Sequence, residues 1–127
     1  MNVISITYLV SALLSFESAI TVVRLNRYAR ANITYAVLAF TFTIFCFMFS
    51  QFLIAADRDC ALIWTELIII AGCFLPPAIA HFSLCLTGKG RIASYPWFLL
   101  LLYASSAFFS IRMLQGHIIT DIILTKW

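Results

Sequence analysis

Four long apolar stretches fill most of this chain of 127 residues, and they decide which solvent it can fold in. They cover residues 3–23, 33–56, 61–86 and 97–116. Each has about the 20 residues that a helix needs to cross a hydrocarbon core about 30 Å thick. With 64% hydrophobic and 10% charged residues, a soluble chain of this length could not hide its apolar surface. The sequence therefore predicts an all-α polytopic membrane protein with four transmembrane helices.

A membrane β-strand is the alternative for Phe40–Phe49, where apolar and polar residues partly alternate. Barrel strands have only about 10 residues, whereas the apolar character here continues over residues 33–56. Phe42, Phe45 and Phe49 also share one face of a helix. A lone pair of strands would leave backbone groups unpaired in lipid, so the helix is favoured.

The four stretches leave room for a single membrane domain over residues 1–127, with residues 117–127 as an outer tail. The longest polar connection has only about ten residues, so no soluble catalytic or nucleic-acid-binding domain fits between the helices. The net charge of +3 lies mostly in loops that flank the membrane and predicts no nucleic-acid partner. The chain is expected to have no enzyme activity and no cofactor, and its predicted partner is the lipid bilayer.

The cysteines do not follow the spacing of a metal site, because no CxxC motif and no Cys/His pair at ligand spacing occurs. We therefore predict no bound metal. Cysteine inside a membrane span acts as a small apolar residue. Three cysteines lie inside the predicted helices and one in the second loop; they are Cys46, Cys60, Cys73 and Cys85.

Basic residues set the predicted orientation. Five lie in the first and third loops and two on the opposite side of the membrane. The five are Arg24, Arg27, Arg30, Lys89 and Arg91, and the two are Arg58 and Lys126. Cytoplasmic loops are rich in lysine and arginine, so both termini are predicted to lie outside. The loop Asp57–Cys60 is tight, which makes the second and third helices antiparallel neighbours.

Ionisable groups inside membrane spans are costly and often functional. Glu17 and His81 each lie about 8–9 Å inside the inner boundary at a rise of about 1.5 Å per residue. Gln51, Glu66 and Arg112 form a second layer near the outer boundary. Each layer holds an acid and a base, so pairing within the layer would lower the cost of burial. We predict that Glu17 pairs with His81, and that Glu66 and Arg112 lie within ion-pair or water-bridged reach with Gln51 nearby. These five residues are the candidates for a ligand or proton site or for a polar core.

Structural explanations stay open for both layers. Arg112 and Glu66 can each reach the headgroups alone, and Glu17 can turn toward Arg24. His81 can likewise face the headgroups.

Pro76 and Pro77 lie in the middle of the third helix. They remove the amide donors that would bond the carbonyls of Gly72 and Cys73, which predicts a helix kink. The freed carbonyls should turn to a neighbouring helix or to water. The kink is interpreted either as a fixed packing bend or as a hinge.

Small residues form a stripe on the first helix, which predicts a close helix–helix seam. The stripe consists of Ser11, Ser15, Ser18 and Ala19. We interpret it as internal packing rather than a dimer face, and a homodimer stays open.

The third helix carries a recognisable pattern: Trp64 at its start, Gly72 and Pro76-Pro77 in its middle, and Thr87-Gly88 at its exit. This pattern resembles the N-terminal seven-helix membrane region of bacterial sensor histidine kinases. The arginine-rich first loop and the segment 116–127 are also similar to that region. The resemblance covers the whole chain but only the first four helices of that region.

The resemblance implies a signal-input module of a two-component system, in a bacterial inner membrane. Helices five to seven and the kinase core lie beyond the part that the chain resembles. They would be its partners, as further segments or as a separate kinase. No kinase activity is expected in these residues.

Two alternatives remain. Four helices and one glutamate in the first resemble small proton-coupled drug transporters, although the chain has only four glycines and a central Pro-Pro that does not suit that class. The other alternative is a membrane-embedded subunit of unknown role.

Overall fold

The computed structural model describes residues 3–88 and 95–115. These residues form four helices, each long and apolar enough to span a membrane: α1 (Val3–Leu25), α2 (Arg30–Phe52), α3 (Arg58–Leu86) and α4 (Pro96–Leu114). The prediction of an all-α membrane protein with four spans is confirmed. The partly alternating segment Phe40–Phe49 is helical throughout. The predicted outer tail lies outside the described residues.

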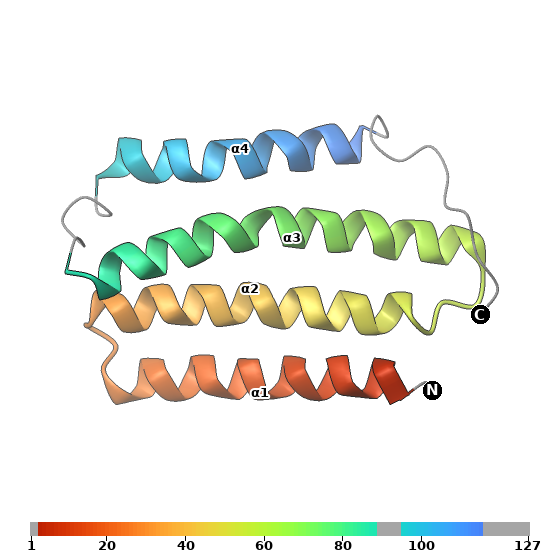
Figure 1. Cartoon of the computed structure of the whole chain (residues 1–127), viewed down its shortest axis with the longest axis horizontal. Helices are drawn as coiled ribbons and strands as arrows, with labels where there is room; N and C mark the ends of the chain where they lie inside the picture. The colour runs from red at the N-terminus through yellow and green to blue at the C-terminus, as the bar shows by residue number, and fades with distance from the viewer. Residues whose placement is uncertain (1–2, 89–94, 116–127) are drawn as a thin grey trace.

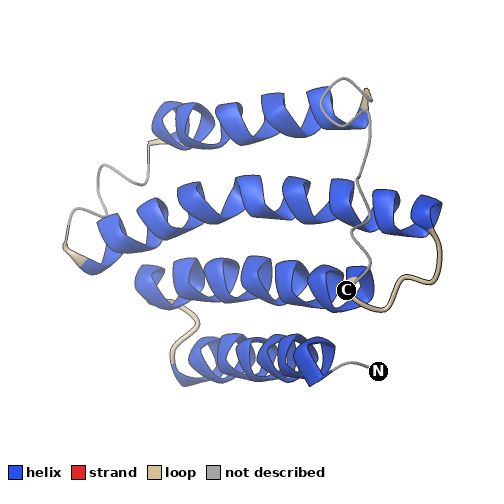
Figure 2. Ribbon diagram, turned by 45° about the vertical axis from the view of Figure 1, so that its right-hand side comes forward, coloured by secondary structure: helices blue, strands red, loops and turns tan. Residues whose placement is uncertain are grey.

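The four helices lie side by side in the order of the chain (Figures 1 and 2). Contacts join α1 to α2, α2 to α3 and α3 to α4. Among the described residues, no Cα atom of α1 lies within 8 Å of a Cα atom of α3, and the same holds for α2 and α4. The described residues therefore form a single row of helices, in which close backbone contacts join only helices that are neighbours in sequence.

Most of the helix surface faces outward. Only 17–22% of the residues in the most apolar window of each helix are buried by protein. Large apolar side chains such as Leu13, Ile79 and Leu100 are exposed on α1, α3 and α4. In a bilayer, lipid chains cover such surfaces, so the lipid bilayer is a required contact of this chain.

A small-residue seam joins α1 to α2. Ser5, Ala12 and Ala19 are buried at intervals of seven residues, which places them along one face of α1. The predicted stripe is thus partly confirmed: Ala19 is buried in the seam, and the hydroxyl of Tyr35 in α2 donates to Ser18 Oγ at 3.2 Å. Ser11 and Ser15 are only half-buried.

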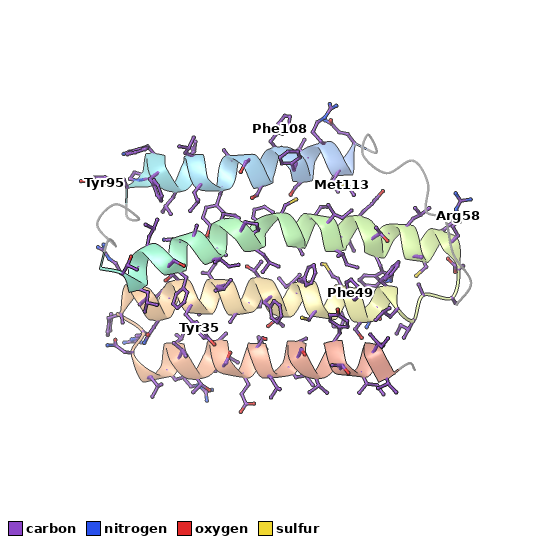
Figure 3. The ribbon with its side chains drawn as sticks, in the orientation of Figure 1. Tyr35, Phe49, Arg58, Tyr95, Phe108 and Met113 are labelled. Carbon is purple, nitrogen blue, oxygen red and sulfur yellow. The ribbon has the colours of Figure 1, made fainter. Side chains whose placement is uncertain are left out.

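At the end of this seam near the start of α1, two buried serines bond each other. Ser50 Oγ donates to the Ser5 carbonyl at 3.0 Å, and Ser5 Oγ donates to the Ser50 carbonyl at 3.2 Å. Beside them, the rings of Tyr8 and Phe49 lie with centroids 4.5 Å apart, and Figure 3 shows Phe49 between the α2 and α1 ribbons. Small residues allow the close approach, and the paired hydroxyls fix the register of the two helices.

The predicted bounds of α2, residues 33–56, are wrong by three to four residues at each end. Its start moves to Arg30 because the Asn32 side chain donates to the Val22 and Asn26 carbonyls and closes the preceding turn. Its end moves to Phe52 because residues 53 and 54 form a turn, and residues 55 and 56 have no regular secondary structure. Hydropathy marks where the membrane is, whereas hydrogen bonds decide where a helix ends.

The connection between α2 and α3 consists of residues 53–57, and Cys60 belongs to the first turn of α3 rather than to the loop. Asp57 caps α3, because its Oδ1 accepts from the Cys60 N–H at 2.7 Å. The connection is short, and α2 and α3 are antiparallel neighbours as predicted. Pro96 occupies the first position of α4, where its missing N–H has no helical partner to lose.

Candidate functional site

The backbone hydrogen bonding of α3 is interrupted in the middle of the helix, at Pro76 and Pro77, and we call this interruption the break. Pro76 and Pro77 lie inside one continuous helix, and Figure 1 shows that helix bowed, with its later part leaning toward α2 and away from α4. A proline at position i has no N–H for the carbonyl at i−4. Pro76 therefore frees the carbonyl of Gly72, and Pro77 frees that of Cys73.

A serine of the neighbouring helix takes over one freed carbonyl. Ser106 in α4 is buried, and its Oγ donates to the Cys73 carbonyl at 2.6 Å. The prediction that a freed carbonyl turns to a neighbouring helix is confirmed for Cys73. Ser110 Oγ, one turn further along α4, donates to the Ser106 carbonyl at 2.8 Å. The two serines and Met113 are the buried residues of α4, and Figure 3 shows Met113 on the side of α4 that faces α3.

The opposite side of the break packs on α2. A Cβ atom added at Gly72 would lie 3.7 Å from Cε2 of Phe45, which is ordinary contact. Ala71, Pro77 and Ala78 are buried around this point. Small side chains before and after the prolines therefore let α2 approach the bent segment closely.

His81 lies one turn beyond the prolines and also faces α4. Its Nδ1 atom lies 3.4 Å from the hydroxyl of Tyr103, and either group can be the donor. The two rings meet edge to face with centroids 6.2 Å apart. The described residues thus give the α3–α4 interface one polar contact at the break and another beyond it.

An open apolar groove of about 420 Å³ runs beside the break. The hydroxyl of Thr41 in its wall already donates to the Val37 carbonyl at 2.8 Å, and that of Tyr103 faces His81. The groove therefore offers an occupant mainly an apolar surface. Its lining comes from α2, α3 and one residue of α4: Val37, Thr41, Ile44, Met48, Leu67, Ile70, Ala71, Phe74 and Tyr103.

The predicted inner pair of Glu17 and His81 is wrong. Equal depth was the basis for it, but α2 lies between α1 and α3 (Figure 1). The Glu17 side chain is exposed on α1, while the partner of His81 is Tyr103. Glu17 also forms no ion pair with Arg24 in the described part of the chain.

The predicted outer pair of Glu66 and Arg112 forms no direct ion pair among the described residues. The two residues do lie on adjacent, antiparallel helices. Glu66 and Gln51 are half-buried, whereas Arg112 is exposed beside the buried Met113. An exposed arginine near the end of a membrane helix can reach the headgroups. A water-bridged contact between Glu66 and Arg112 stays a prediction.

Three contributors were missed at the sequence level: Ser106, Tyr103 and the Ser5–Ser50 pair. For Ser106 a signal existed, because it lies near the middle of α4, as the prolines' freed carbonyls lie near the middle of α3. A hydroxyl at matching depth is a natural donor for a freed carbonyl in lipid. For Tyr103 the signal was that its polar hydroxyl lies in the half of α4 that runs beside His81 of α3.

No protein-family model matches the chain, and no curated protein and no solved structure is significantly similar to it. By the length and hydropathy of its four described helices, the chain is a multi-pass membrane protein.

Proposed function

We propose that this chain is the membrane-embedded signal-input module of a bacterial two-component system, and that the α3–α4 interface is its moving part. The single observation that carries the proposal is the Pro76-Pro77 break bridged by Ser106. A helix that lacks two backbone hydrogen bonds bends most easily at that point. A partner helix holds that place through one hydroxyl, so a small change in their packing would favour one of two arrangements.

The sequence pattern supports the same proposal. The Trp64, Gly72, Pro76-Pro77 and Thr87-Gly88 pattern of α3 resembles the membrane region of sensor histidine kinases. In such a module, catalysis would belong to a kinase outside these residues. The part proposed for this chain is to change shape in the inner membrane and to pass that change on.

The test is a deletion of this gene segment in the source bacterium, complemented with variants of the chain. A signal-input module predicts a change in a limited set of transcripts, restored by the wild-type chain. Pro76→Ala with Pro77→Ala should restore fewer of them, because both amide donors return and the helix stiffens. Pro96→Ala is the matched control, since that proline starts α4 and breaks no helical bond.

The same strains separate the transporter alternative. A proton-coupled drug transporter predicts that the deletion raises sensitivity to lipophilic cations, and that Glu17→Gln fails to restore resistance. That result, together with an unchanged transcript profile, would replace the signal-input proposal. Sequencing the DNA downstream of Trp127 adds a direct check, because the proposal expects further helices and a kinase core there or in a neighbouring gene.

A further inference from the structure

The turn between α1 and α2 is held rigid by two asparagine side chains. Asn26 Oδ1 accepts the N–H groups of Tyr28 and Ala29 at 3.0 and 3.2 Å. Asn32 Nδ2 donates to the carbonyls of Val22 and Asn26 at 3.2 and 3.0 Å. The Asn32–Val22 bond ties α2 to the end of α1, and the other three bonds brace the turn between them, so groups carried by the turn are held in place.

Cationic groups gather on this rigid turn. An open recess of about 550 Å³ lies there, lined by Val23, Arg24, Leu25, Asn26, Arg27 and Tyr28. The Arg27 guanidinium stacks 4.9 Å from the centre of the Tyr28 ring and donates to its hydroxyl at 2.7 Å. Tyr28 thereby orients Arg27 while leaving most of its five N–H donors available.

These arginines have no carboxylate partner of their own. Within residues 3–88 and 95–115, neither Arg24 nor Arg27 forms an ion pair. Asp57 and Asp59 lie at the start of α3, and Figure 1 shows that this start and the α1–α2 turn lie at opposite ends of the helices. Glu17 lies two turns before Arg24 on α1. The recess is therefore a concentration of positive charge that an external anion can neutralise.

Lipid-facing residues adjoin this charge. Ile20 and Leu25 are exposed large apolar residues on α1, and Leu13 and Leu14 continue that surface into the membrane span. A ligand that fits both parts has an anionic head and apolar chains. Basic residues at a membrane boundary attract anionic lipid headgroups, and the guanidinium fork matches the two free oxygens of a phosphodiester.

We propose that the α1–α2 turn is a binding site for an anionic phospholipid, with the phosphate held by Arg24 and Arg27 and one acyl chain lying along α1. A zwitterionic lipid fits worse, because its ammonium group would lie close to the same arginines. The asymmetry of basic residues predicts that the site faces the cytoplasmic leaflet.

The experiment is a titration of the purified full chain in neutral detergent, with lipid adducts counted by native mass spectrometry. Phosphatidylglycerol should bind more tightly than phosphatidylcholine with the same acyl chains. Arg24→Gln with Arg27→Gln should weaken phosphatidylglycerol binding by about tenfold or more, because each basic residue near a membrane surface contributes about a fivefold attraction. Binding of phosphatidylcholine should stay unchanged.

The matched control is Lys89→Gln with Arg91→Gln, which removes the same charge from the same predicted side of the membrane and should have little effect. Arg24→Lys with Arg27→Lys keeps the charge without the planar fork and should lose part of the affinity. If the glutamine variant loses its helical circular dichroism signal, the lysine variant still tests whether the arginines bind the phosphate. Equal binding of the two lipids would overturn the proposal, and so would an equal loss in the control. Displacement of the lipid by inorganic phosphate would indicate a free-anion site instead.

Discussion

At the scale of single residues, the fold depends on hydroxyl groups that replace backbone donors. Ser106 bonds a carbonyl that Pro77 leaves free, and Ser5 and Ser50 bond each other's carbonyls across the α1–α2 seam. In the hydrocarbon core no water is present to donate a hydrogen bond to these carbonyls, so leaving one unpaired is costly. Interhelical hydrogen bonds in membranes are nonetheless modest, about 0.6 kcal/mol on average.

Ser106→Ala should lower the unfolding free energy by about 0.6–1.7 kcal/mol, because the Cys73 carbonyl loses its donor. Ser105→Ala is the control, since Ser105 is exposed on the same helix. In a Pro77→Ala background the loss should shrink, because residue 77 then supplies the amide donor within α3. Unfolding in mixed micelles with rising denaturing detergent measures the wild type, the three single variants and the double variant. Equal losses from Ser106→Ala in both backgrounds would show that Ser106 does not substitute for the missing amide.

At the scale of the helices, sequence reasoning found the elements and missed some of their ends. Apolar length predicted α1 to α4, and the two prolines predicted a freed carbonyl in α3. The bounds of α2 were wrong because the side chain of Asn32 decides its start and the turn at residues 53–54 decides its end. Neither feature changes the hydropathy. Proline chemistry is local and can be derived from the sequence, whereas a cap depends on which side chain reaches back.

The predicted orientation of the helices can be tested with Cys60. This residue is half-buried in the first turn of α3. Along the helix axes, that turn and the α1–α2 turn lie at opposite ends (Figure 1). We expect a membrane-impermeant thiol reagent to modify Cys60 from outside intact cells, because the basic residues favour the other end for the cytoplasm. Lys89→Cys, combined with Cys60→Ser, should react only after the cells are opened. The reverse pattern of modification would mean that both termini face the cytoplasm.

At the scale of the whole molecule, the row arrangement explains why the predicted inner pair failed. The prediction placed Glu17 and His81 at the same depth, and equal depth suggested contact. Depth along the membrane normal is one coordinate, however, and the order of helices in the plane is another. Sequence fixes the first through distance from the helix ends but leaves the second open, and here α2 lies between the two residues.

Cysteine cross-linking tests the row. In a background with the four native cysteines replaced by alanine, Ser5→Cys with Ser50→Cys should form an intramolecular disulfide readily, because the two Oγ atoms lie 3.0 Å apart. Glu17→Cys with His81→Cys should not, because α2 separates their helices. Mass spectrometry after mild oxidation distinguishes the two results. An intramolecular disulfide between positions 17 and 81 would mean that the helices form a closed bundle in the membrane.

The row has a consequence for how the chain is made. In the described part of the chain, close backbone contacts join each helix only to the one before it and the one after it. Every such interface therefore joins segments that leave the ribosome one after the other. Proteins built from such local contacts need little loop-closure entropy to fold. The α1–α2 pair can assemble as soon as α2 enters the bilayer, and α3 and α4 can then add in turn. The order of synthesis is thereby also the order of assembly.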